Sequence, residues 1–134
     1  MKHVEVAAAL IFENGKVLGT RRGNSPYPYL AHKFEFAGGK IEKGERGEDA
    51  VKRELEEELG LKVKVENLFS VTNFTYPDFS ITLYLYECSM LSGFTLKEHE
   101  EYAFFSPSEL DASEWAPADA EVIETIKRVF GATE

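Results

Sequence analysis

The sequence predicts an α/β fold in which a mixed β-sheet is layered with helices. Apolar stretches with the length and alternation of strands occur before and after a helical segment, and a second amphipathic helix closes the chain. A tight-turn signal joins the first two strands, which makes that pair antiparallel, whereas a helical crossover brings strands together in parallel. We therefore expect one domain, residues 1–134, built on a mixed sheet.

The N-terminal third contains three of the expected strands and one long loop. Residues 4–12 are almost continuously apolar, which is typical of a strand that is buried on both faces. The Asn-Gly pair at residues 14–15 is a strong hairpin signal and leads into a strand over residues 16–21. The Gly-, Pro- and Tyr-rich segment 23–32 predicts a loop, and residues 33–37 alternate as a short strand. Three side chains of this loop could line a pocket or lie at the surface as turn residues: Tyr27, Tyr29 and His32.

The central helix is expected to begin near residues 47–49, after a polar loop over residues 40–46, and to end at Gly60. Its apolar stripe consists of Val51, Leu55 and Leu59. The remaining elements follow in chain order: strands over residues 63–74, 79–90 and 102–105, a capped helical turn over residues 106–110, and an amphipathic helix that ends at Gly131.

Composition limits the classes of partner. The chain has a formal net charge of −9 and a pI near 4.9, so a binder of nucleic-acid polymers is not expected, because such proteins present a basic face. No apolar run approaches the roughly 18 residues of a membrane span, and no membrane partner is expected. The single Cys88 has no partner pattern and is expected in the core. The expected setting is a reducing cytoplasm, with the chain as a monomer or weak homodimer.

The central helix concentrates negative charge. Glu54, Glu57 and Glu58 fall on neighbouring parts of one helical face, while Glu56 points elsewhere. Like charges at this spacing cost an isolated helix roughly a few tenths of a kcal/mol per pair, so a compensating cation is expected. Carboxylates that converge from one turn form the all-oxygen site that Mg²⁺ or Mn²⁺ prefers. A solvated acidic helix is the alternative interpretation of the run by itself.

The residues around these carboxylates complete a longer pattern. It consists of Gly39, Glu45 after five intervening residues, Arg53-Glu54-Leu55 after seven more, Glu57-Glu58 after one, and Gly60-Leu61 after one. The pattern resembles the signature box of the Nudix hydrolases, with every defined position filled. This resemblance implies an α/β/α sandwich in which the box forms a loop, a helix and a loop. It also implies metal-dependent hydrolysis of a phosphoanhydride in a small-molecule nucleotide.

The resemblance also implies roles for residues of the box. Arg53 matches the family's arginine that pairs with the first glutamate of the box, here Glu45, and orients the ligand helix. Mg²⁺ is the expected cofactor, with Mn²⁺ as a substitute. Four groups resemble the family's metal ligands: Glu54, Glu57, Glu58 and the backbone carbonyl of Gly38.

Further roles follow from the MutT-type branch, which the chain resembles over most of its length. Lys40 is placed to meet a phosphate oxygen. In this branch a carboxylate from a later loop activates the attacking water. Glu98 has the expected spacing, eight residues before Ser106, and Glu100 is the second candidate, although either could be a solvated loop carboxylate. His99 stands between them and could be a base by its ordinary pKa, although a single loop histidine is more often exposed.

The MutT-type branch cleaves nucleoside triphosphates to the monophosphate and pyrophosphate. Residues that match its nucleotide-binding positions are Arg22, Phe36, Asp78 and Asp119. Enzymes that select 8-oxo-dGTP tightly carry asparagine at the position of Asp119 and usually proline at the position of Ala37. An ionised carboxylate accepts hydrogen bonds and suits the amino group of cytosine. CTP and dCTP, with loose specificity, are therefore the first expectation, and 8-oxo-dGTP or another oxidised purine nucleotide is the second.

Further alternatives stay open. A buried Asp119 with a raised pKa could donate a hydrogen bond, which would readmit oxidised purines. Tyr76 and Pro77 hint at ADP-ribose or a dinucleoside polyphosphate, although a turn between two strands also explains them. A Nudix-type module that binds nucleotides without catalysis is the alternative of another class.

Overall fold

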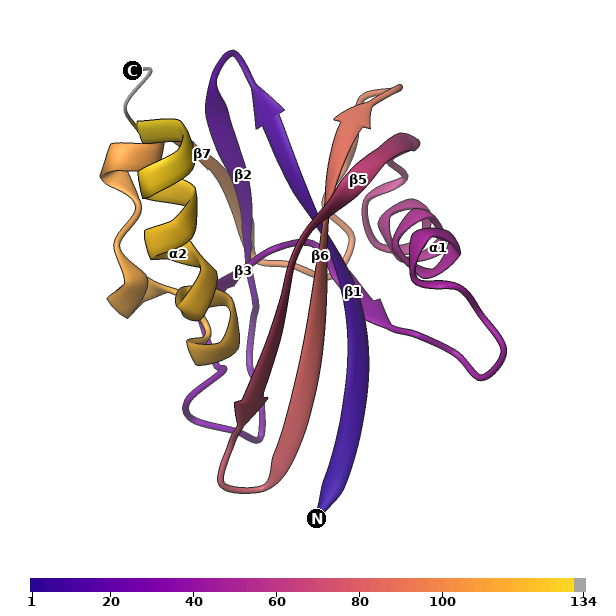
Figure 1. Ribbon diagram of the computed structural model, residues 1–134, viewed down its shortest axis with the longest axis vertical. Coiled ribbons are helices and arrows are strands. Elements are labelled where there is room, and N and C mark those ends of the chain that lie inside the picture. Colours follow the sequence, from indigo (N-terminus) through magenta and orange to yellow (C-terminus); the bar gives the residue numbers. More distant parts are fainter. Residues whose placement is uncertain (132–134) are drawn as a thin grey trace.

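Strand β1 (Lys2–Glu13) is the centre of a mixed sheet in the computed structural model, which describes residues 1–131 (Figure 1). It pairs antiparallel with β2 (Lys16–Arg21) and parallel with β6 (Phe79–Met90). The other strands extend the sheet: β3 (Phe34–Glu35) and β7 (Glu101–Phe105) on β2, β5 (Val63–Thr75) on β6, and β4 (Gly38–Lys40) on β1. The predicted mixture of antiparallel and parallel pairs is confirmed.

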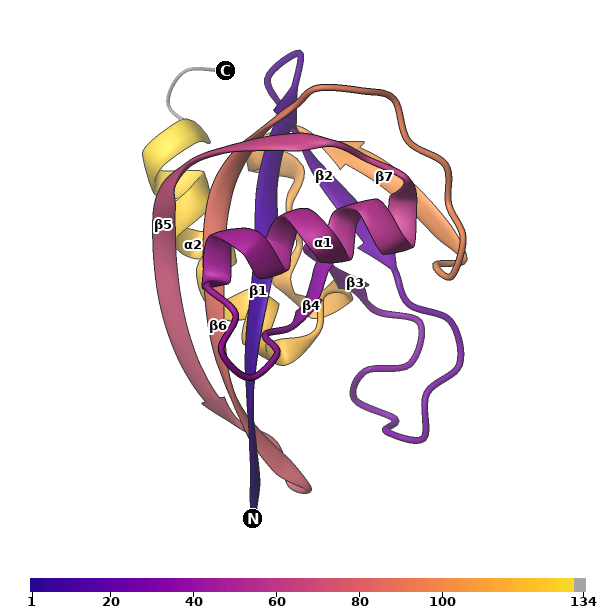
Figure 2. The same cartoon turned by 90° about the vertical axis from the view of Figure 1, so that its right-hand side faces the viewer.

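The two α-helices cover opposite faces of this sheet. Figure 1 shows α1 (Gly47–Leu59) on one side and α2 (Pro117–Phe130) on the other, and Figure 2 shows α1 lying across the strands. Because side chains alternate along a strand, β1 supplies both cores. Its residues divide between the side of α1, with Ala7, Ala9 and Ile11, and the side of α2, with Ala8 and Leu10. The expected α/β/α sandwich is confirmed.

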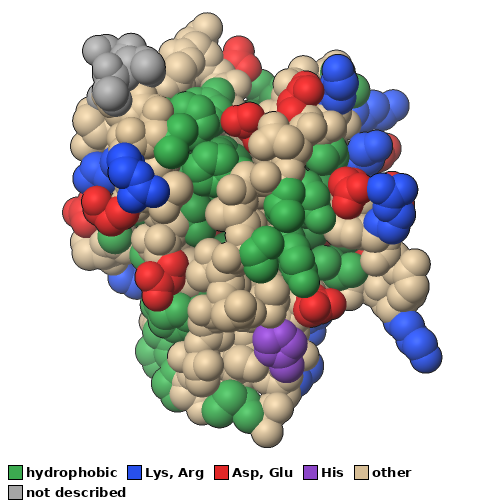
Figure 3. All heavy atoms as spheres, in the orientation of Figure 1, with side chains coloured by type: hydrophobic (Ala, Val, Ile, Leu, Met, Phe, Trp, Pro, Cys, Tyr) green, Lys and Arg blue, Asp and Glu red, His purple; other side chains and the backbone are tan. Residues whose placement is uncertain are grey.

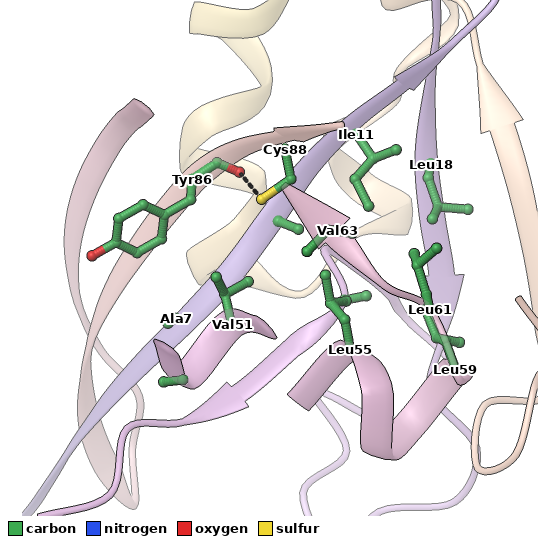
Figure 4. Packing of buried hydrophobic residues seen from close by; sticks show 13 residues of the cluster. Ala7, Ile11, Leu18, Val51, Leu55, Leu59, Leu61, Val63, Tyr86 and Cys88 are labelled. Atoms are coloured by element: carbon green, nitrogen blue, oxygen red, sulfur yellow. Dashed lines mark hydrogen bonds between the residues drawn. The ribbon is translucent and has the colours of Figure 1, made fainter. Parts of the chain in front are cut away.

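The apolar stripe of α1 fills the core on its side of the sheet. In Figure 4, Val51, Leu55 and Leu59 of the helix point toward the strands, where Ile11 is one of the facing side chains. These helix residues are fully buried, and burying a side chain of this size contributes about 1.5–3 kcal/mol. Gly60 adopts a left-handed conformation, with φ of 61°, and ends the helix as predicted.

The segment before α1 differs from the prediction. The strand expected over residues 33–37 is limited to Phe34–Glu35. Gly38 and Gly39, which were assigned to no element, form β4 together with Lys40, which was expected in a loop. A side chain at Gly38 would meet the Ala7 carbonyl and the backbone of Ala8, so glycine is what lets β4 lie this close to β1. The pairing depends on residues distant in the sequence, which the local pattern does not reveal.

The C-terminal part contains two short 3₁₀ turns before α2. The first, η1 (Pro107–Glu109), has the predicted cap, in which the Ser106 amide donates to Glu109 Oε1 at 2.9 Å. The second, η2 (Ala112–Glu114), leads into the closing helix. No helix within residues 1–131 is long and apolar enough to cross a membrane. Cys88 is buried, as expected.

The face drawn in Figure 3 has hydrophobic side chains in its middle and both acidic and basic side chains toward its margins. Among the exposed apolar residues are Leu68 and Val71 of β5, which are 47% and 48% exposed. Most basic side chains on this face stand beside acidic ones.

Candidate active site

Arg53 organises the carboxylates of α1. Its guanidinium donates to both oxygens of Glu45, from Nε at 2.8 Å and from Nη2 at 3.0 Å. Nη1 donates to Glu54 at 2.9 Å and to Glu57 at 3.1 Å. The hydrogen bonds from Arg53 lower the pKa of Glu45 to about 2, so this carboxylate stays ionised at neutral pH. The pairing of Arg53 with Glu45 that the box implied is therefore present.

The backbone of β4 turns two carbonyl groups toward this cluster. On either side of β4, the Ala37 carbonyl and the Ile41 amide form hydrogen bonds with β1. Backbone groups alternate in direction along a strand, so every second residue of β4 directs its carbonyl toward β1. The carbonyls of Gly38 and Lys40 therefore point to the opposite edge. The Lys40 carbonyl accepts from Arg53 Nη2 at 3.0 Å, which leaves the Gly38 carbonyl on the same edge as a candidate ligand.

Glu54 and Glu58 are the more enclosed carboxylates of the helix, with side chains 14% and 18% exposed. The carboxylate of Glu54 occupies the place that a Cβ on Gly39 would fill, so the glycine forms a cradle for it. Glu58 Oε2 is buried and accepts no hydrogen bond from the residues that the structure describes. Burial raises the pKa of Glu58, and the charges of Glu35 and Glu54 add to this effect.

The donor set fits a hard divalent cation, although the side chains are not gathered around one point. Among the described residues, no three His, Cys, Asp or Glu side chains are arranged to hold a metal ion. The expected convergence of Glu54, Glu57 and Glu58 is thus incomplete, because Arg53 lies between the first two. Glu57 is 59% exposed and is free to turn away from Arg53. The orphaned oxygen of Glu58 and the cradle for Glu54 are the features that suit a cation.

A cavity of about 360 Å³ lies beside this cluster, between the sheet, α2 and the loop after β2. Its wall is mainly apolar along β1 and β6, which suits the flat face of a base. Tyr27 of the loop lines it, whereas His32 is directed to Glu100 instead, with Nδ1 and Oε1 2.9 Å apart. All of the residues that the sequence predicted as nucleotide contacts line this cavity: Arg22, Phe36, Lys40, Asp78 and Asp119.

Asp119 is the buried carboxyl group of the cavity. It stands in the first turn of α2, is 8% exposed, and its Oδ2 accepts a hydrogen bond of 2.9 Å from the Phe36 amide. The pKa of Asp119 is raised to about 7, mainly by burial. The charge of Glu35 also raises this pKa, by more than the opposing charge of Arg22 lowers it. Both protonation states of this carboxyl group are therefore accessible near neutral pH.

Glu35 is a functional candidate that the sequence reasoning missed, and His99 was considered there only as a possible base. Glu35 lines the cavity, and its Oε1 accepts from Arg22 at 3.0 Å and 2.8 Å. His99 was expected at the surface, but its side chain is 6% exposed and its Nε2 lies 3.1 Å from Glu35 Oε2. Burial lowers the pKa of His99, but the hydrogen bond and charge of Glu35 outweigh this effect and raise it overall. No local signal marks either residue, because the contact joins β3 to the distant loop after β6.

The loop between β6 and β7 carries both candidates for the general base. Glu98 is exposed, and its charge raises the pKa of Glu58, which places it in electrostatic reach of α1. Glu100 bonds to His32 and also lies 3.1 Å from Arg21 Nε. Glu100 is thus engaged by His32 and Arg21, whereas Glu98 forms no ion pair among the described residues.

Comparison with known proteins places this site in a family. A model of the NUDIX domain matches residues 1–126. The chain belongs to the Nudix family. Nudix hydrolases generally use a divalent metal, which agrees with the chemistry of the oxygen donors that α1 and β4 supply.

Relatives of this Nudix chain are similar over nearly their whole length. An 8-oxo-dGTP diphosphatase of Escherichia coli (strain K12) is 37% identical over 131 residues, covering 96% of this chain and 100% of the relative. A CTP pyrophosphohydrolase of the same organism is 36% identical over 126 residues, covering 92% and 91%. The solution structure of the E. coli ORF135 protein superposes with a TM-score of 0.84 at 32% identity, covering 98% and 94%. The resemblance seen in the sequence is thus confirmed.

Proposed function

We propose that this Nudix hydrolase cleaves nucleoside triphosphates to the monophosphate and pyrophosphate, with Mg²⁺ as cofactor and Mn²⁺ as a substitute. This proposal is supported by the position of the oxygen-donor cluster of α1, which lies next to an apolar cavity that contains a buried carboxyl group. The ion would be held by Glu54, Glu57, Glu58 and the Gly38 carbonyl. When bound, it would screen the charge of the phosphate oxygens and lower the pKa of water.

The protein's own groups would position the substrate and move the proton. Arg53, fixed by Glu45, holds the α1 carboxylates in orientation, and Lys40 at the cavity mouth meets a phosphate oxygen. Glu98 accepts the proton of the attacking water on its carboxylate, because this side chain is free of the ion pairs that engage Glu100. Phosphoryl chemistry of this kind depends mostly on such positioning and on charge stabilisation.

Asp119 supplies base recognition in this proposal, and its raised pKa supports two classes of base. Ionised, its free oxygen accepts from the amino group of cytosine. Protonated, it donates to the keto oxygen of 8-oxoguanine, while an unprotonated oxygen can face the added N–H of that base. Glu35 of β3, Arg22 and Tyr76 are the charged or titratable groups that face it. The relatives named for the two activities are 37% and 36% identical, so identity does not rank them.

The proposal predicts that base preference changes with pH. Pyrophosphate release from CTP, dCTP and 8-oxo-dGTP is measured with Mg²⁺ at about pH 6 and about pH 8.5, on either side of the raised pKa of Asp119. We expect the ratio of kcat/KM for 8-oxo-dGTP over dCTP to fall as pH rises. A ratio that is constant across this range would remove the protonation of Asp119 from base recognition.

A further inference from the structure

His99 is buried between the nucleotide cavity and the carboxylates of α1. It belongs to the loop between β6 and β7, and its side chain is 6% exposed. Its Nε2 lies 3.1 Å from Glu35 Oε2 and 3.9 Å from Glu58 Oε2. None of the roles proposed above uses this imidazole, although it touches a residue of each half of the site.

On the cavity side, both carboxylate oxygens of Glu35 form hydrogen bonds. One oxygen accepts two hydrogen bonds from Arg22, and the other faces His99. A carboxylate engaged at both oxygens by charge-assisted bonds has a fixed orientation. Arg22 and Glu35 both line the cavity, so a base that bonds to either one acts on the position of His99.

On the helix side, His99 faces Glu58, whose side chain is 18% exposed, with His99 Nε2 3.9 Å from Glu58 Oε2. Glu58 Oε2, the oxygen nearest to His99, has no hydrogen bond from the described residues. A carboxylate ligand must be correctly turned before a divalent ion binds, and outer contacts of this kind set its orientation.

We propose that His99 is a positioning residue that links the nucleotide cavity to the metal-binding carboxylates, so that an occupied cavity strengthens binding of the divalent ion. The inference rests on the function proposed above. A base that fixes Arg22 and Glu35 also fixes the imidazole, which then holds Glu58 in place for the ion. Linkage requires that the ion strengthens nucleoside binding by the same factor.

The test measures Mn²⁺ affinity by electron paramagnetic resonance, with and without saturating cytidine or 8-oxo-2′-deoxyguanosine. These nucleosides carry no phosphate and so have no phosphate contact to the ion. In the wild-type chain we expect the nucleoside to lower the Kd for Mn²⁺ about fivefold or more. His99→Phe keeps the ring but has no hydrogen-bonding group, and should lose this coupling while still binding each ligand separately. His99→Gln keeps an N–H donor and should retain part of the coupling.

A matched control is His3→Asn, since His3 contacts Ser80 and Thr82 elsewhere on the sheet. This variant should show the coupling of the wild-type chain. Coupling that survives in His99→Phe, or that is absent from the wild-type chain, overturns the role of His99 and leaves the proposed function standing. If the wild-type chain binds neither Mn²⁺ nor a nucleoside and turns over no triphosphate, the proposed function itself fails.

Thermal unfolding checks that the variants are folded. If His99→Phe does not fold, Glu35→Gln replaces it, because this change keeps the shape of Glu35 but removes its negative charge and so weakens its bonds to Arg22 and His99. The nucleoside should then lower the Kd for Mn²⁺ by a smaller factor in Glu35→Gln than in the wild-type chain. An equal factor in the two proteins overturns the proposal.

Discussion

Glu57 is the most exposed of the three α1 carboxylates proposed as metal ligands and the easiest to test by substitution. Its side chain is 59% exposed and its contact is an ion pair with Arg53 at 3.1 Å. Glu57→Gln should lower kcat by more than about tenfold, or about 1.4 kcal/mol of barrier, because it removes a proposed ligand. The free energy of unfolding should change by less than about 1 kcal/mol, as for other exposed ion pairs.

The control for this substitution is Glu56→Gln on the neighbouring, exposed position of the same helix. It removes an equal charge but no proposed ligand, so its kcat should stay near that of the wild-type chain. Equal activity in both variants would contradict the assignment of Glu57 to the ion.

Asp119→Asn is the second test at this scale. The amide donates and accepts at every pH, so the dependence of base preference on pH should disappear and 8-oxo-dGTP should be favoured throughout. Folded Asp119 has a pKa of about 7 against an ordinary value of 3.8, so its contribution to stability is complete below about pH 4 and is lost as pH rises through 7. Urea unfolding should therefore show a smaller loss of stability over this range in the variant. An identical loss in both proteins would contradict the raised pKa.

Sequence patterns predicted the site to the extent that its residues lie in motifs of fixed spacing. The α1 carboxylates, Arg53 and Glu45 are of this kind, and the predicted bond between Arg53 and Glu45 is present. The expected nucleotide contacts came from the family resemblance instead; they line one cavity, and their contact with a nucleotide stays a prediction. Glu35 and His99 were not predicted in their roles, since their hydrogen bond joins segments 64 residues apart. The position of Arg53 between Glu54 and Glu57 also depends on side-chain geometry that helical spacing does not fix.

At the scale of elements, β4 fixes the distance between the sheet and α1. Gly39→Ala would place a methyl group against the flexible carboxylate of Glu54, which can move aside. We expect weaker Mn²⁺ binding and lower kcat, with little change in unfolding free energy. Gly38→Ala would instead press on the β1 backbone, which cannot move, and should cost about 1–3 kcal/mol of stability. Calorimetry and Mn²⁺ titration of the two variants check this contrast, and equal stability losses would contradict it.

The elements with strong periodicity were predictable, and the short paired segments were not. The stripe of α1, the Asn-Gly hairpin and the two long strands of the second hairpin follow from local patterns. The strand β4 contains two glycines and three residues in all, so its identity depends on pairing with β1.

At the scale of the molecule, the sandwich brings the two halves of the site together. The sheet places the residues of α1 on one face and those of α2 on the other, while β3, β4 and the loop after β6 connect them. The α1 carboxylates and Asp119 of α2 thus come from opposite layers: Asp119 lines the cavity together with residues of β4, and Glu54 lies against Gly39 of that strand. A triphosphate with its base in the cavity would extend from one layer toward the other.

The most direct test of the account is to identify the products formed from CTP and 8-oxo-dGTP by phosphorus NMR, with Mg²⁺ and with the metal chelated. We predict the nucleoside monophosphate and pyrophosphate from both substrates, and no turnover when the ion is removed. Release of inorganic phosphate with the diphosphate, faster cleavage of ADP-ribose than of either triphosphate, or nucleotide binding without turnover would contradict it.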